Sequence, residues 1–152
     1  DAMFTEDKTI SCAVLTADCI PILVTESSGR MIGCIHAGWR GLQSKIIENF
    51  FSKFKSISKS NFRILLGPCI SAQNYEVSDE IFCQFSNYSD RFRKNKSGNY
   101  YMDLRYIACD ILNELGITNV TISKSCTYND NFYSYRKDKT TGRFVSLIWF
   151  KK

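Results

Sequence analysis

Short apolar runs separated by polar turns predict a strand-rich first third of the chain. Residues 11–15, 20–24 and 31–35 each form such a run, and β-branched residues recur in them. Because these runs follow one another closely, we expect them to be antiparallel neighbours. Further strands are expected at residues 62–66, 120–123 and 144–150.

Apolar residues spaced three and four positions apart predict two principal helices, at residues 43–54 and 104–115. One face of the first helix carries Ile46, Ile47, Phe50, Phe51 and Phe54. The second helix has Asp103 at the position of an N-cap, and Gly116 stands where a helix commonly stops.

The remaining pattern is shorter and more polar. A short helix is expected at residues 78–85, and the polar, basic residues 87–99 are expected to be flexible. Strands and helices follow one another without regular βαβ repeats, which indicates an α/β (α+β) class with layered mixed β-sheets flanked by helices. A length of 152 residues is typical of one domain, so we expect residues 1–152 to form a single unit.

Composition excludes several classes of protein. Hydrophobic residues make up 44% and charged residues 23%, which is typical of a globular chain and excludes disorder. The net charge of +5 suits an anionic ligand, but it is too small for a nucleic-acid-binding arm. No apolar run reaches the roughly 18 residues of a membrane span, so we expect neither nucleic acid nor a membrane as partner. The acidic N-terminal residues predict no signal peptide.

Seven cysteines and a single histidine limit the chemistry. The cysteines show no Cys-x-x-Cys spacing, so zinc-ribbon and thioredoxin motifs are excluded. Most of them lie in apolar runs, as reduced cysteines do in a protein core, which favours a cytoplasmic protein. Any cysteine–histidine catalysis must use His36, and three histidines cannot bind zinc within this chain.

Two segments at expected strand ends combine reactive residue types. Asp18 and Cys19 interrupt two apolar runs. They form either a reactive pair or a turn in which Asp18 caps backbone N–H groups and Cys19 packs in the core. Residues 35–41, Ile-His-Ala-Gly-Trp-Arg-Gly, follow a strand and precede a helix. There Arg40 and the helix start would bind an anion and His36 would be a metal ligand or base, unless the segment is only a structural turn.

Two further segments give weaker signals. Cys69 follows Gly-Pro after an expected strand and is either a nucleophile or a packed thiol. Residues 126–138 interleave aromatic side chains such as Tyr135 with cations such as Arg136. This segment could stack on a base and hold an anion, although a solvated strand face is the more ordinary interpretation.

Cys19 and His36 are expected to lie near each other. If the strands around the turn at residues 27–30 pair as a hairpin, the two residues fall at about the same height. A thiolate and an imidazole so placed are either two zinc ligands or a nucleophile–base pair. Zinc would need further ligands, and the chain has no other histidine.

Four segments, in order and spread over nearly the whole chain, resemble the laccase-domain family, whose members include polyphenol oxidases and purine nucleoside phosphorylases of the YfiH type. They are Thr-Ala-Asp-Cys-Ile-Pro at 16–21, residues 35–41, Gly-Pro-Cys-Ile at 67–70 with Tyr-Glu-Val at 75–77, and residues 126–149 around Phe-Tyr-Ser-Tyr-Arg-Lys-Asp. The resemblance implies the laccase-domain fold. It also implies phosphorolysis of adenosine, inosine and methylthioadenosine by inorganic phosphate, together with adenosine deamination.

The resemblance further implies a zinc site of histidine, cysteine and histidine. Cys19 matches the cysteine ligand of the family and His36 its second histidine ligand. The first histidine lies, in the family, upstream of the segment that here begins at Asp1. We therefore expect a chain that lacks the N-terminal portion of its domain and supplies two of the three zinc ligands. Such a chain would leave part of an apolar face uncovered and would tend to form homo-oligomers.

The expected chemistry gives these residues roles. Phosphorolysis must hold a phosphate beside the ribose C1′ and help to protonate the leaving purine. We expect catalytic roles for Asp18, Cys19, His36 and Arg40, metal binding by Cys19 and His36, and substrate binding by Arg40, Cys69, Tyr135 and Arg136.

Three alternatives remain open at this point. Cys19 and His36 could serve a metal-free cysteine hydrolase. Copper could replace zinc in a polyphenol oxidase, or the chain could be a binding module with a degenerate site. Metal analysis and phosphate-dependent release of base from inosine distinguish these alternatives.

Overall fold

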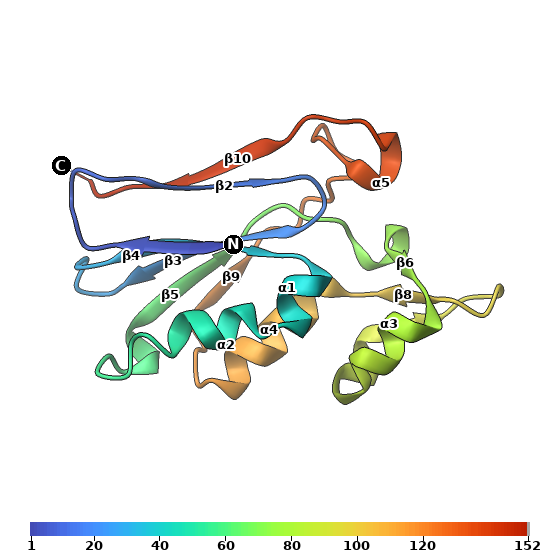
Figure 1. Cartoon of the computed structure of the whole chain (residues 1–152), viewed down its shortest axis with the longest axis horizontal. Helices are drawn as coiled ribbons and strands as arrows, with labels where there is room; N and C mark the ends of the chain where they lie inside the picture. Colours follow the sequence, from blue (N-terminus) through green and yellow to red (C-terminus); the bar gives the residue numbers. More distant parts are fainter. Residues whose placement is uncertain (152) are drawn as a thin grey trace.

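A five-stranded sheet is the centre of the computed structural model, which describes residues 1–151. Its strands, in spatial order, are β1 (Ala2–Thr5), β4 (Ile32–Ala37), β3 (Ile20–Glu26), β5 (Phe62–Leu66) and β9 (Val120–Ile122). Neighbouring strands run antiparallel, except that β9 lies parallel to β5. Three helices cover one face of this sheet: α1 (Trp39–Gln43), α2 (Ile46–Phe51) and α4 (Leu104–Glu114) (Figure 1).

An antiparallel pair of strands, β2 (Cys12–Thr16) and β10 (Phe144–Ile148), forms a second layer over the opposite face (Figure 1). A third, small sheet lies at one end of the molecule, in the order β6 (Glu76–Val77), β8 (Tyr100–Met102), β7 (Phe92–Lys94). The remaining elements are α3 (Asp79–Gln84), α5 (Tyr135–Asp138) and the 3-10 helices η1 (Lys59–Asn61), η2 (Ala72–Asn74) and η3 (Ser86–Arg91).

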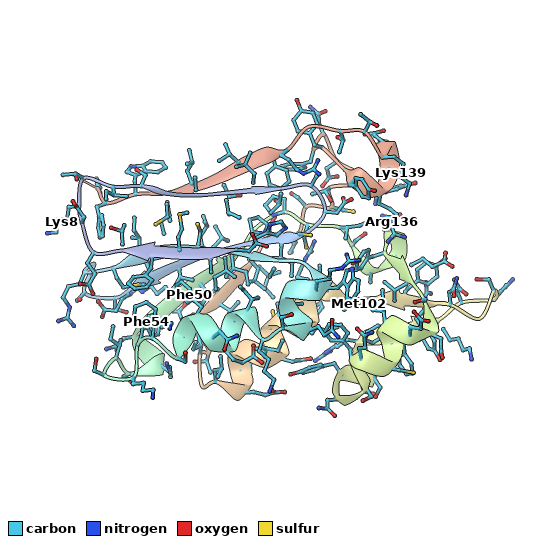
Figure 2. All side chains as sticks on the ribbon, in the orientation of Figure 1. Lys8, Phe50, Phe54, Met102, Arg136 and Lys139 are labelled. Carbon is cyan, nitrogen blue, oxygen red and sulfur yellow. The ribbon has the colours of Figure 1, made fainter. Side chains whose placement is uncertain are left out.

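The apolar residues of the strands alternate between buried and outward-facing positions, as a half-covered sheet requires. In β5, Phe62, Ile64 and Leu66 are buried against the helical layer, whereas Leu65 is exposed. Phe50 and Phe54 extend the helical side of this core (Figure 2). Between the sheets lies a second, smaller cluster, formed by Cys12, Val14, Ile32 and Cys34 with Leu23, Ile148 and Phe150 packed against it.

The outer face of the β2–β10 pair is apolar and exposed. The register places Leu15 opposite Val145 and Ala13 opposite Leu147. Leu15, Val145, Leu147 and the nearby Trp149 are all about half or more exposed, at 58%, 51%, 48% and 64%. No helix in residues 1–151 is long and apolar enough to cross a membrane.

The expected class of layered mixed sheets flanked by helices is confirmed. The residues expected at the two ends of α4 are confirmed as well. The Asp103 side chain accepts a hydrogen bond from the Tyr106 N–H at 3.1 Å, and Gly116 after the helix has a φ of 77°. One neighbour relation was wrong. The strand expected at residues 11–15 leaves the sheet of β3 and β4 and pairs with β10 instead.

Three local expectations are corrected. The single helix at residues 43–54 is two helices, because Lys45 adopts a left-handed conformation with a φ of 58° between them. Residues 87–99, expected to be flexible, contain β7 and most of η3, and a bidentate ion pair from Arg91 to Asp110 joins them to α4 at 2.6 and 2.8 Å. Residues 2–5 form β1, which no hydrophobic pattern predicted.

Two adjacent leucines in β5 test this account of the core. Replacing the fully buried Leu66 by Ala is expected to lower the free energy of unfolding by about 2–5 kcal/mol, because it leaves a cavity in packed surroundings. The same change at Leu65, which is 40% exposed, is expected to cost less than about 1 kcal/mol. Urea denaturation measures both, and equal losses would contradict the assigned alternation.

Candidate functional site

A cavity of about 420 Å³ opens where β3 begins and β4 ends, and where α5 faces the start of α1. Six of the seven residues expected in the site line it: Asp18, Cys19, His36, Arg40, Tyr135 and Arg136. Asp1, Ala17, Gly38, Trp39, Gly41, Tyr75 and Lys139 complete its wall. The cavity therefore unites residues from the start, the middle and the end of the chain.

The β3–β4 hairpin brings Cys19 and His36 into this cavity. Pro21 pairs with His36 and Ile20 with Ala37, so Cys19 stands at the level of Gly38. Cys19 and His36 thus lie at nearly the same level of the hairpin, two residues apart in register, as expected. A Cβ atom added to Gly38 would lie only 2.7 Å from the Cys19 Sγ, so glycine is needed at this position for the thiol to occupy its place.

The protonation states of the pair follow from their surroundings. Burial raises the pKa of the Cys19 thiol to about 11, and the negative charge of Asp18 adds to this effect. Burial lowers the pKa of His36, and the positive charge of Arg143 acts in the same direction. At neutral pH the protein alone therefore holds a thiol beside a neutral imidazole, whereas a cysteine nucleophile works as a thiolate.

The donor atoms suit a soft metal such as zinc, which takes cysteine sulfur and histidine nitrogen. Zinc sites use three or four protein ligands. Within residues 1–151, no group of three or more His, Cys, Asp or Glu side chains is arranged to hold a metal ion. Cys19 and His36 can therefore provide part of a zinc site and do not complete one.

Three cationic side chains face the same cavity. The Arg40 guanidinium lies 4.3 Å from the centroid of the Trp39 ring, and that of Arg136 lies 5.1 Å from the centroid of Tyr75. Lys139 follows α5, and Figure 2 shows it at the same end of the molecule as Arg136. No carboxylate in the described part of the chain lies within ion-pairing distance of these cations. Such a group can bind an anion without first breaking an ion pair.

Asp18 lines the cavity, and each of its carboxylate oxygens accepts a hydrogen bond from another part of the protein. Its Oδ1 accepts a hydrogen bond from the Thr127 hydroxyl at 2.6 Å, and its Oδ2 accepts one from the Arg136 backbone N–H at 2.6 Å. The residue is 7% exposed, and its φ of 87° is unusual for a residue other than glycine.

Cys69 is the one expected site residue that the structure does not bring to the cavity. It is fully buried, its Sγ accepts a hydrogen bond from the Arg105 Nε at 3.3 Å, and burial raises the pKa of its thiol. The adjacent Ile70 donates its N–H to the Asp18 carbonyl, so Cys69 lies in the support behind the cavity wall.

Sequence reasoning missed Tyr75 and Lys139 as site residues. Tyr75 belongs to the Tyr-Glu-Val segment that resembled the family, but nothing local indicated that its ring would underlie an arginine. Burial raises the pKa of the Tyr75 hydroxyl, so it is a neutral hydrogen-bond donor at physiological pH. For residues 126–138 a solvated strand face and a binding segment were both open, and α5 turns Tyr135 and Arg136 into the cavity.

The layered sheets hold a cavity that brings together a thiol, an imidazole and three cations, and this chemistry suits a small anionic molecule. The chain matches, over residues 1–151, the family model described as multi-copper polyphenol oxidoreductase laccase, and it belongs to that family.

Relatives of the chain include a purine nucleoside phosphorylase of Haemophilus influenzae, 35% identical over 99% of this chain and 65% of that protein. The purine nucleoside phosphorylase YfiH of Escherichia coli is 36% identical over 98% of this chain and 63% of that protein. A crystal structure of a Neisseria meningitidis protein superposes with a TM-score of 0.94 at 35% identity, covering all of this chain and 65% of the other. YlmD from Geobacillus stearothermophilus gives a TM-score of 0.92 at 27% identity, covering all of this chain and 61% of the other. The chain thus spans less than two thirds of these proteins.

Gly38→Ala tests the close approach to Cys19. We expect the added methyl group to displace the Cys19 side chain, at a cost of about 1–3 kcal/mol in unfolding free energy, because the new Cβ would lie 2.7 Å from the Cys19 Sγ. A crystal structure and urea denaturation measure these effects. Gly41→Ala is the milder comparison, since its Cβ would lie 3.3 Å from the His36 carbonyl oxygen, which a shift of a few tenths of an ångström relieves. An unmoved sulfur in the Gly38 variant would contradict the model of the cavity wall.

The single histidine allows a direct test of the electrostatics. In the presence of EDTA, the His36 ring proton signal is expected to titrate below the ordinary pKa of about 6.5. The unfolded chain then binds more protons than the folded one in this window. The part of the unfolding free energy that depends on a neutral His36 is therefore fully present above about pH 6.5. It is lost as the pH falls through the pKa of the folded state. His36→Gln should remove both the signal and this pH dependence, and a midpoint at or above 6.5 would contradict the assignment.

Proposed function

We propose that the protein carrying this chain is a purine nucleoside phosphorylase, which splits adenosine, inosine and methylthioadenosine with inorganic phosphate. The observation that carries this proposal is the group of three unpaired cations, Arg40, Arg136 and Lys139, that faces Cys19 and His36 across one cavity. The names of the relatives in Haemophilus influenzae and Escherichia coli support the same activity.

The cavity suits a nucleoside and a phosphate. Its volume of about 420 Å³ lies within the range of small-molecule sites, which is about 300–1,000 Å³. Arg40 and Arg136, whose guanidinium groups lie over the rings of Trp39 and Tyr75, would present planar sets of donors to a phosphate. The aromatic rings beside them offer surfaces for a purine. Fixed cations at this place hold the nucleophile near C1′ and stabilise the negative charge that moves through the reaction.

Zinc is the metal that we propose for the cysteine and histidine pair. Cys19 and His36 would hold it together with ligands from outside the described residues, and copper is the alternative metal. A bound cation would favour the thiolate form of Cys19. Adenosine deamination belongs to the same proposal as a second activity, and release of ammonia from adenosine tests it.

The other candidates have less support. A metal-free cysteine hydrolase needs a thiolate, and burial raises the pKa of the Cys19 thiol to about 11. A multi-copper oxidase centre needs several imidazoles, of which this chain supplies one, His36. All seven cysteines are free thiols, which supports a reducing compartment such as the cytoplasm as the proposed location.

Substitution of the two proposed ligands tests the function. In the protein that carries this chain, Cys19→Ala and His36→Ala are each expected to abolish phosphorolysis of inosine and to remove most of the bound zinc, because one ligand is lost from a small set. Phosphate-dependent release of hypoxanthine and elemental analysis measure the two effects.

Cys34→Ala is the matched control. Cys34 lies two residues from His36 on β4, but it is 2% exposed and packs in the small cluster between the sheets. Its substitution is expected to cost stability, about 1–3 kcal/mol, without a specific loss of rate or zinc. Normal activity with full zinc occupancy in either ligand variant would overturn the assignment.

A further inference from the structure

Asp18 is a charged residue at the cavity that the proposed chemistry does not require. It is 7% exposed, and burial of a carboxylate is costly unless hydrogen bonds compensate for the lost water. Both bonds that compensate for it come from one distant segment of the chain. Thr127 is 109 residues away in sequence and Arg136 is 118 residues away.

The segment that Asp18 holds carries two of the three cations of the cavity. The N–H of Arg136 lies in the first turn of α5, a helix of four residues that is too short to be stable by itself. Ser134 caps this helix by accepting the Lys137 N–H at 3.3 Å, and the Arg136 Nη1 donates to the Glu76 carbonyl at 2.8 Å. The bond to Asp18 is the shortest of these attachments and involves a charged acceptor, so it is the strongest among them.

We propose that Asp18 is a positioning residue that fastens the start of α5 to the strand end carrying Cys19, so that Arg136 and Lys139 face the thiol–imidazole pair and the cavity binds phosphate. Asp18 follows Ala17 and precedes Cys19 in the turn between β2 and β3, so its carboxylate joins the two halves of the site directly. The inference rests on the proposed phosphate site for its binding test only.

The hydrogen-bonding pattern distinguishes this role from catalysis. A catalytic carboxylate must keep an acceptor site open to the substrate, whereas each oxygen of Asp18 accepts a bond from the protein and the residue is only 7% exposed. Asparagine at this position would keep one oxygen for the Arg136 N–H, and its amide group could donate to the Thr127 hydroxyl. Glycine would remove both acceptors and would tolerate the φ of 87°. A positioning role therefore predicts that Asn substitutes for Asp18 far better than Gly does.

The experiment compares Asp18→Asn and Asp18→Gly in two measurements. Amide hydrogen exchange should show faster exchange at residues 134–139 in the Gly variant, intermediate exchange in the Asn variant, and unchanged protection in α4. Calorimetric titration with inorganic phosphate should show that the affinity for phosphate is about tenfold or more weaker in the Gly variant and only a few-fold weaker in the Asn variant. If the Gly variant does not fold, Thr127→Val is measured in its place, because it removes only the hydrogen bond from the Thr127 hydroxyl to Asp18.

Asp130→Asn is the matched control, because the Asp130 Oδ2 also accepts a backbone N–H, from Cys126 at 2.8 Å, but Asp130 does not line the cavity. It should change neither the exchange at residues 134–139 nor phosphate affinity. Unchanged exchange in the Gly variant, or equal effects of Asn and Gly, would overturn the inference. Absence of phosphate binding in the unsubstituted protein would refute the phosphate site instead, and the exchange measurement would still decide the role of Asp18.

Discussion

The antiparallel register of β3 with β4 is the constraint on which the site depends. It pairs Pro21 with His36, and a shift by one residue would turn the imidazole to the opposite face of the sheet. The same register places Cys19 against Gly38, where no side chain larger than hydrogen fits. One face of both strands is buried in the main core and the other in the small cluster between the sheets, so the hydrophobic effect that stabilises the sheet also fixes the thiol and the imidazole.

The cavity has two structurally distinct halves. One half, Cys19 and His36, is built on the hairpin at the centre of the main sheet. The other half, Arg136 and Lys139, comes from a short helix and the residue after it, close to the outer β2–β10 layer (Figure 1). Rigid placement of the second half depends on a few polar contacts instead of a core, because no residue of α5 is buried. The site therefore joins a well-packed element to one held by hydrogen bonds.

Local patterns were sufficient to predict much of this arrangement. Alternation and helical spacing located the main strands and the face of α4, and the turn at residues 27–30 predicted the hairpin that unites Cys19 with His36. These features depend on neighbouring residues, so a single sequence contains them. The interleaved aromatic and cationic residues around Arg-Lys-Asp gave a weak local signal of a binding segment, and the resemblance to a family strengthened it.

Contacts between distant segments could not be predicted in this way. The left-handed Lys45 divides a helix that has an unbroken apolar face, and the pairing of β2 with β10 joins residues more than 120 positions apart. Cys69 and Cys19 follow similar local patterns, yet one is enclosed beside Arg105 and the other lines the cavity. Such differences depend on what the rest of the chain packs against each residue.

The stack of Arg40 on Trp39 also gives the cavity an optical signal of its own. The chain has two tryptophans: Trp39 is in the cavity wall, and Trp149, 64% exposed, is beside the outer layer. Their indole rings therefore emit from different surroundings, and a soluble collisional quencher reaches Trp149 more readily. A purine that stacks near Trp39 would change only one of the two emissions. Occupancy of the cavity can thus be followed by intrinsic fluorescence, without a label and without turnover.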